Sequence, residues 1–270
     1  MLAVSCMIVD HQQRRWIFMP TRDTWAPGLE AAQGMHEVWI DHLSAHPEQA
    51  GQPVRLHGLW LPRPEGDAPV LLFLHGVRWT VHASAPRMRQ LHALGFSVLS
   101  IDYRGFGLSS DALPSETLAA EDARAAWRWL AHRHPQARRF VFGHSLGASL
   151  AIELALAVDD EAGVIVEGAF TSAADVLRST RWGWLPVYAL MTQHFDAGRR
   201  VADIGSPLLV VHGSADEMVA PQLGRELYER AMPPKRFVLV DGGEHENTDV
   251  IGHAQYRSAV RELFGLHTPH

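Results

Sequence analysis

The sequence predicts a single α/β domain in which helices cover both faces of a mostly parallel sheet. Short apolar segments alternate along the chain with amphipathic helical patterns. Several of these segments, such as VLLFLH and LLVVH, are apolar at almost every position, as expected for strands that are buried on both faces. A chain of 270 residues is long enough for one such domain.

The predicted elements follow one another in a regular order. In the segment Glu116–Arg133 the apolar residues recur at steps of three and four, as one buried helix face requires. The strand pattern is found at Val54–Leu61, Val70–His75, Ser97–Tyr103, Phe140–Gly143, Gly163–Glu167, Leu208–His212 and Phe237–Asp241. The helical pattern is found at Pro86–Leu94, Glu116–Arg133, Leu146–Val158, Leu223–Ala231 and Ala254–Leu263.

Two regions depart from this alternation. Residues 1–53 hold weak strand signals at Arg15–Met19 and Glu37–His42, which we interpret as an antiparallel edge of the sheet and not as a second domain. Residues 171–206 are longer than one crossover helix needs and are rich in aromatic side chains. We expect residues 171–206 to form a small cap inserted into a single domain of residues 1–270.

Composition and charge exclude several classes of function. The net charge is −6 and no basic run is present, so nucleic-acid binding is not expected. The apolar stretch Met1–Val9 ends at Asp10, too short to span a membrane. Cys6 is the single cysteine, which fits a reducing compartment, and we expect a cytoplasmic protein. Composition does not predict an oligomeric state.

The stretch FVFGHSLGASLAI carries the clearest chemical signal. Ser145 lies between a strand pattern and a helix pattern, with glycine two residues before it and two after it. This G-x-S-x-G arrangement is typical of a nucleophile elbow, a strained turn that exposes a serine hydroxyl at a helix N-terminus. The alternative is a glycine-rich turn with an incidental capping serine.

A serine nucleophile needs a base and a carboxylate that orients the base. Asp216 and His245 each follow a predicted strand in a glycine-containing turn, in the chain order that the elbow arrangement requires. Glu167, at the end of another strand, is a second choice for the acid. The oxyanion hole is predicted from the backbone N–H groups of Leu146 and of Val77, which follows Gly76 after an earlier strand.

In these motifs the chain resembles the α/β-hydrolase superfamily, and more narrowly its serine-hydrolase branch of Bem46-like proteins, esterases and acyl-protein thioesterases. The matching stretches, in the family's order, are WIFMPTRD, LLFLHG, SIDYRGFGLSS, FGHSLGAS, IVEGAFTS, LLVVHGSADEMV and DGGEHEN. The resemblance implies the α/β-hydrolase fold, a triad of Ser145, Asp216 and His245, and a cap at residues 171–206. The chain departs from the family at the bulky loop VRWTVHAS after His-Gly.

The expected function is a carboxylesterase- or thioesterase-type serine hydrolase acting on a small-molecule or acyl substrate. No motif for a metal or a cofactor is present. A perhydrolase that uses the same triad, and a catalytically silent binding protein on the same fold, are the alternatives. Which ester is cleaved is not predicted. The candidate substrate-pocket residues are Arg78, Trp79, His144, Trp182, Trp184 and Tyr188.

Overall fold

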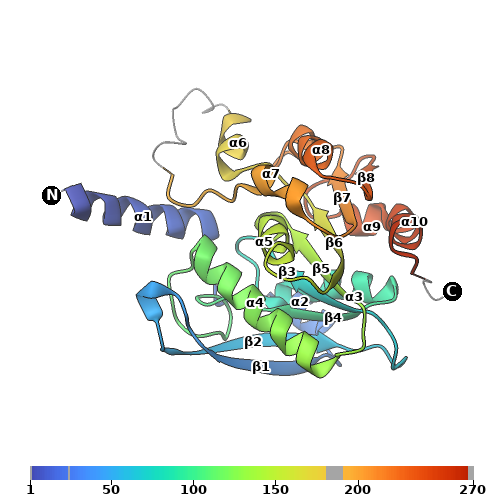
Figure 1. Ribbon diagram of the computed structural model, residues 1–270, viewed down its shortest axis with the longest axis horizontal. Helices are drawn as coiled ribbons and strands as arrows, with labels where there is room; N and C mark the ends of the chain where they lie inside the picture. Colours follow the sequence, from blue (N-terminus) through green and yellow to red (C-terminus); the bar gives the residue numbers. More distant parts are fainter. Residues whose placement is uncertain (1, 24, 181–190, 267–270) are drawn as a thin grey trace.

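The structure, a computed structural model, describes residues 2–23, 25–180 and 191–266, with the backbone alone for residues 2–6. Its centre is one eight-stranded sheet in the order β1-β2-β4-β3-β5-β6-β7-β8 (Figure 1). Strands β3 to β8 are parallel to one another, while β1 and β2 form an antiparallel edge. The strands are β1 His36–Leu43, β2 Pro53–Leu61, β3 Val70–Leu74, β4 Ser97–Ile101, β5 Arg139–His144, β6 Glu161–Glu167, β7 Leu208–Gly213 and β8 Lys235–Val240.

Each predicted strand of the parallel sheet is present, and its ends lie within two residues of the predicted ones. The predicted antiparallel edge is confirmed in part, because Glu37–His42 lies inside β1, which pairs with β2. The helices are α1 Leu2–Phe18, α2 Ala26–Ala31, α3 Val81–Ala93, α4 Glu116–Arg133, α5 Leu146–Ala155, α6 Ala173–Arg178, α7 Ala197–Arg200, α8 Pro221–Arg230, α9 Thr248–Ile251 and α10 His253–Phe264, with 3-10 turns η1 Pro47–Gln49 and η3 Val201–Asp203.

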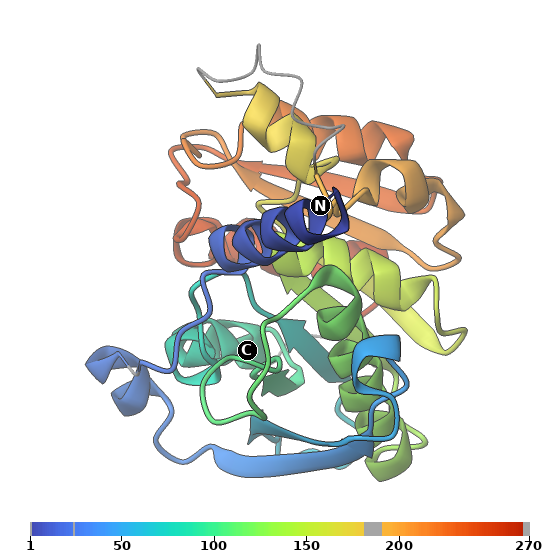
Figure 2. The same ribbon diagram turned by 90° about the vertical axis from the view of Figure 1, so that its left-hand side faces the viewer.

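The core is divided by the sheet into two layers. α4, α5 and α8 bury their apolar faces on one side, and α3 and α10 on the other (Figures 1 and 2). Strand β3 shows why both sides need cover. Its residues Leu72 and Leu74 face the first layer and Leu71 and Phe73 the second, because side chains alternate along a strand.

The prediction of a strand at Arg15–Met19 was wrong, because this segment ends helix α1. Contacts distant in sequence hold the helix. The Arg14 guanidinium donates from Nε to the Pro114 carbonyl over 3.0 Å, and the Phe18 ring lies 5.7 Å from that of Phe195. The backbone N–H of Thr192 donates to the Gln13 side chain over 2.8 Å. The start of α1 projects away from the rest of the fold (Figure 1).

The helix predicted at Pro86–Leu94 begins earlier, at Val81. Proline is favoured in the first turn of a helix, but Pro86 does not mark the start of α3. Instead Thr80 caps the helix, since its hydroxyl accepts from the N–H of Ala83 over 3.4 Å. Pro86 therefore lies within α3 and lacks only its own N–H donor.

Residues 171–206, predicted as a cap, are described in part. They include α6, α7 and η3. The aromatic residues Trp182, Trp184 and Tyr188 lie outside the described residues, so their predicted contact with substrate stays a prediction.

Among the described residues, none of the helices has the length and apolar character needed to cross a membrane.

A buried ionic network ties the loop after β4 to α4 and to the chain after β1. The Arg104 guanidinium is 1% exposed, donates to Asp122 over 2.8 Å and pairs with Glu121. The Ser44 hydroxyl donates over 2.8 Å to the same Glu121 oxygen that Arg104 contacts, and the Ala45 N–H donates to the other oxygen. Burial alone would raise the pKa of Glu121, but hydrogen bonds from Arg104, the Ala45 N–H and Ser44 outweigh it and lower that pKa to about 2.

We expect Glu121→Gln to destabilise the fold at neutral pH by about 3 kcal/mol, because it breaks a buried ion pair from one side. A carboxyl with a lowered folded pKa stabilises the fold above its unfolded pKa of about 4.3, and the contribution is lost as pH falls towards about 2. The unfolding temperature of the variant should therefore fall less steeply with acid than that of the wild type. Thermal unfolding followed by circular dichroism across this pH range measures both effects.

The matched control is Glu229→Gln, which changes an exposed carboxylate on α8. Parallel pH slopes for wild type and Glu121→Gln would contradict the role assigned to Glu121.

Candidate active site

Ser145 occupies a strained turn between the end of β5 and the start of α5. Its φ is 55° and its ψ is −120°, a conformation that residues other than glycine rarely adopt. The two flanking glycines explain how the turn fits. A Cβ at Gly143 would lie 2.6 Å from Cα of Ala148, and one at Gly147 would lie 2.7 Å from the His75 carbonyl oxygen. The sequence G-x-S-x-G is thus required by close backbone packing.

Asp216 and His245 meet beyond the carboxyl ends of β7 and β8. Nδ1 of His245 lies 2.7 Å from Oδ2 of Asp216, and both side chains are nearly buried. Oδ1 of Asp216 accepts from the N–H groups of Met218 and Val219 over 2.9 and 2.8 Å. Since Nδ1 donates to a carboxylate, Nε2 is the nitrogen that carries the lone pair in the neutral imidazole of His245, and it is buried without a hydrogen-bond partner in the described part of the chain.

The carboxylate of Asp216 is held in its charged form. Burial acts to raise its pKa, but hydrogen bonds from His212 and His245 hold that pKa well below its usual value. Nε2 of His212 lies 3.2 Å from Oδ2 of Asp216 and 2.9 Å from the Val219 carbonyl. His212 therefore supports the same carboxylate oxygen that His245 uses.

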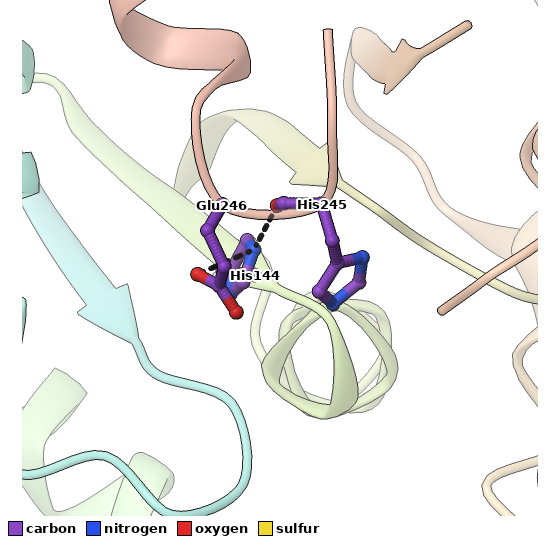
Figure 3. Close-up of side chains that lie close together, drawn as sticks. All are labelled: His144, His245 and Glu246. Carbon is purple, nitrogen blue, oxygen red and sulfur yellow. Dashed lines mark hydrogen bonds and ion pairs between the residues drawn. The ribbon is translucent and has the colours of Figure 1, made fainter. Parts of the chain in front are cut away.

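His144, next to Ser145, joins the serine turn to the histidine loop. Its Nε2 lies 3.0 Å from the His245 carbonyl oxygen, and its side chain is 1% exposed. Figure 3 shows this bond, with the His245 ring pointing away from Glu246 and towards the helix α5. On the other side, a Cβ at Gly168 would lie 2.9 Å from Cε1 of His245, so the ring packs directly on the backbone after β6.

A buried ion pair supports the loop that carries His245. Arg87 pairs with Glu167 and donates from its second nitrogen to the Glu246 carbonyl over 3.0 Å. The Tyr256 hydroxyl also bonds to Glu167. Burial raises the pKa of the Glu167 carboxyl well above its usual value, the nearby Asp249 carboxylate raises it further, and burial lowers the pKa of its partner Arg87. Two successive carbonyls of the loop, those of His245 and Glu246, are thus held by buried side chains.

Asp216 and Glu167, the two residues predicted as candidates for the acid, have different partners in the structure. Asp216 bonds directly to Nδ1 of His245, whereas Glu167 is engaged by Arg87 and Tyr256. Sequence reasoning missed Arg87. A signal was present, because Arg87 lies at helical spacing between the buried residues Ser84 and Leu91 of α3, where a charge needs a buried partner.

The two segments that carry the predicted oxyanion donors lie next to Ser145. A Cβ at Gly76 would lie 3.1 Å from Cβ of Ser145, which puts the loop after β3 against the serine. Within the described residues, the backbone N–H groups of Val77 and Leu146 have no hydrogen-bond acceptor. Leu146 is also the first residue of α5, where the helix dipole favours negative charge.

The other predicted pocket residues differ in exposure. Arg78 is exposed, and Trp79 is half-buried with its ring centroid 5.7 Å from that of His144. His144 is turned into the support of the His245 loop, so a contact between its side chain and substrate stays a prediction.

His144, His245 and Glu246 could offer three ligand atoms within 4.8 Å of one another (Figure 3). However, Nε2 of His144 faces a carbonyl oxygen, to which it must donate a proton. A nitrogen that carries a proton has no lone pair for a metal ion. The group therefore fits the support of a loop better than a metal centre.

Comparison with known families and proteins places the chain among hydrolases. Residues 67–193 and 172–248 match the family described as serine aminopeptidase, S33. The uncharacterized protein Rv2307c of Mycobacterium tuberculosis is 33% identical over 260 residues, covering 95% of this chain and 89% of that protein. The lysophosphatidylserine lipase ABHD12 of Danio rerio is 29% identical over 189 residues, covering 63% of this chain and 49% of that protein.

Solved structures share the fold. The esterase Pf2001 of Pyrococcus furiosus has a TM-score of 0.70 at 20% identity, over 91% of this chain and 97% of that one. A monoacylglycerol lipase of Paleococcus ferrophilus has a TM-score of 0.58 at 20% identity, over 77% of this chain and 97% of that one. At these identities the likeness concerns the fold, and it confirms the fold class predicted from the sequence.

We expect Gly147→Ala to destabilise the protein by about 3 kcal/mol or more, because the added methyl group meets backbone atoms that cannot move aside. For a domain of this size the unfolding temperature should fall by roughly 10 °C. Differential scanning calorimetry measures the shift. Gly66→Ala is the control, since a Cβ there meets nothing within 4 Å. Equal shifts for the two variants would show that backbone packing does not explain Gly147.

Proposed function

Because the chain belongs to the serine aminopeptidase S33 family of α/β hydrolases, we propose that it cleaves carboxylic ester or thioester bonds through an acyl-enzyme on Ser145. One observation carries the proposal. Nδ1 of the buried His245 is bonded to Asp216, which leaves Nε2 without a partner in the described part of the chain. An imidazole in this state can accept a proton from a neighbouring serine.

The proposed reaction has two halves. Oγ of Ser145 attacks the carbonyl carbon while Nε2 of His245 takes its proton, and the resulting oxyanion accepts hydrogen bonds from the N–H groups of Val77 and Leu146. His245 then passes the proton to the departing alcohol or thiol, leaving the acyl group on Ser145. A water molecule, deprotonated by His245, releases the acid and restores the hydroxyl. Asp216 orients the imidazole and stabilises its charged form throughout.

The names of relatives support ester chemistry for this chain. Pf2001 is described as an esterase and ABHD12 as a lysophosphatidylserine lipase. Residues 171–206 are proposed to cover the site as a cap within one domain and to contact the apolar part of the substrate. The perhydrolase alternative keeps the same triad, and peracid formed from peroxide and a carboxylic acid would reveal it.

We expect a fluorophosphonate probe to label the wild type and not Ser145→Ala, because the probe reacts with an activated serine hydroxyl. Hydrolysis of 4-nitrophenyl esters by the variant should fall by about 1000-fold or more. An ester series of rising acyl length sizes the pocket, and an aminoacyl 4-nitroanilide in the same panel tests peptide-type cleavage.

The control is Ser149→Ala, which removes a buried hydroxyl from the next turn of α5. A folded wild type that resists the probe would sink the nucleophile assignment and favour the silent binding protein.

We expect His144→Leu to lower kcat by about 10- to 100-fold with little change in KM, because the His245 loop loses the donor that fixes its carbonyl. His144→Gln keeps a donor and should recover much of the loss. Steady-state kinetics on one soluble ester measures both parameters, and calorimetry checks that both variants are folded. If Leu and Gln at this position give the same kcat, the hydrogen bond to the His245 carbonyl is not what positions the base.

A further inference from the structure

An open groove lies beside the loop that carries Val77, where the end of α1 meets the chain after β3. Its volume is about 530 Å³, and it is lined by Arg15, Trp16, Met19, Pro20 and Arg78. Both Trp16 and Met19 are exposed, at 84% and 40%. The groove therefore offers apolar contacts together with two guanidinium groups.

The charge of the groove is not compensated. No carboxylate lines it, and within the described residues neither Arg15 nor Arg78 forms an ion pair with an aspartate or a glutamate. By contrast, the neighbouring Arg14 pairs with Asp10, at 3.4 Å, and with Glu48. Two unpaired guanidiniums in one groove are suited to an anion, because each can form charge-assisted hydrogen bonds with a carboxylate or phosphate.

Arg78 has an energetically unfavourable backbone conformation. Its φ is 62°, in the left-handed region that favours glycine, although the side chain is exposed and gains little from burial. The N–H of Arg78 donates to the Phe18 carbonyl over 3.3 Å, and its Nε lies 2.9 Å from the sulfur of Met19. The sulfur contact holds Nε of Arg78 beside Met19, and its terminal nitrogens form no hydrogen bond with the residues that the structure describes. Strain at an exposed residue points to a functional role.

The groove is within reach of the reacting serine. Arg78 follows Gly76 by two residues, and a Cβ at Gly76 would lie 3.1 Å from Cβ of Ser145. Since consecutive Cα atoms are about 3.8 Å apart, the Cα of Arg78 lies within about 8 Å of that of Gly76. A substrate bound at Ser145 can therefore extend into the groove if its chain is long enough to span this separation, on the order of 10 Å.

We propose that this groove is a subsite for an anionic group, a carboxylate or phosphate, carried by the ester substrate. Arg78 and Arg15 bind the anion, and Trp16 and Met19 contact the adjoining apolar atoms. The proposal rests on the function proposed above and specifies the substrate class as anionic esters.

The test compares soluble 4-nitrophenyl esters whose acyl chains end in a carboxylate or in the matched neutral carboxamide, at several chain lengths. The wild type should prefer the carboxylate in kcat/KM by about tenfold at the best length, through KM, since one charge-assisted hydrogen bond is worth about that factor. The ratio of the two substrates should fall towards one in the double variant Arg15→Gln/Arg78→Gln and at high salt. Arg128→Gln, on the exposed side of α4, should keep the wild-type ratio.

Other outcomes overturn the proposal in distinguishable ways. A wild-type ratio near one at every length, with the neutral esters turned over, would exclude the anionic subsite while leaving the proposed function intact. The anion could instead be the phosphate of a lipid headgroup on a membrane surface. Sedimentation with phosphatidylglycerol vesicles, compared with phosphatidylcholine vesicles, tests this alternative. If the double variant loses vesicle binding but keeps its substrate ratio, the groove serves a lipid surface and not the substrate.

A failure of the proposed function has its own signature, namely no ester hydrolysis and no fluorophosphonate labelling. In that case calorimetric titration with inorganic phosphate still tests the groove. Binding to the wild type that is lost in the double variant would support an anion site, and equal heats for the two proteins would overturn it.

Discussion

The close contact between the start of α5 and the end of β3 is the constraint on which the rest of the site depends. β3 and β5 are neighbours in the parallel sheet, so a helix that begins directly after β5 must pass the carbonyls at the end of β3. Gly147 permits that passage, and the helix then starts so early that Ser145 must adopt a positive φ. The same contact brings the loop after β3 against Ser145.

A parallel sheet supplies the remaining groups by geometry. The carboxyl ends of β5, β7 and β8 open on one edge, and the residues that follow them include Ser145, Asp216 and His245. Strand geometry alone does not fix the conformation of the loops that follow these strands. Buried polar groups from α3 and α10, Arg87 and Tyr256, meet Glu167 on the other side of the sheet and so connect the histidine loop to the second layer of the core.

How much of this arrangement can be predicted from the sequence depends on how far apart along the chain the interacting residues are. The strand, turn and helix around Ser145 were predictable because their signals lie within one short segment, and the order of Asp216 and His245 followed from strand ends. The helical state of the segment before Met19 was not predictable, since its partners Pro114, Thr192 and Phe195 are far away in the chain. The Arg87–Glu167 ion pair was not predicted for the same reason, since its two residues are far apart in the chain.

The position of α1 has a practical consequence for handling the protein. Its carboxyl end is bonded to the backbone of Arg78, two residues beyond Gly76, and its middle is bonded to Thr192. An affinity tag, deletion or fusion partner at the amino terminus therefore acts on a helix that is mechanically linked to the wall of the reaction centre. Turnover measured on amino-terminally altered protein would report the state of that linkage as well as the chemistry, so purification handles belong at the other end of the chain.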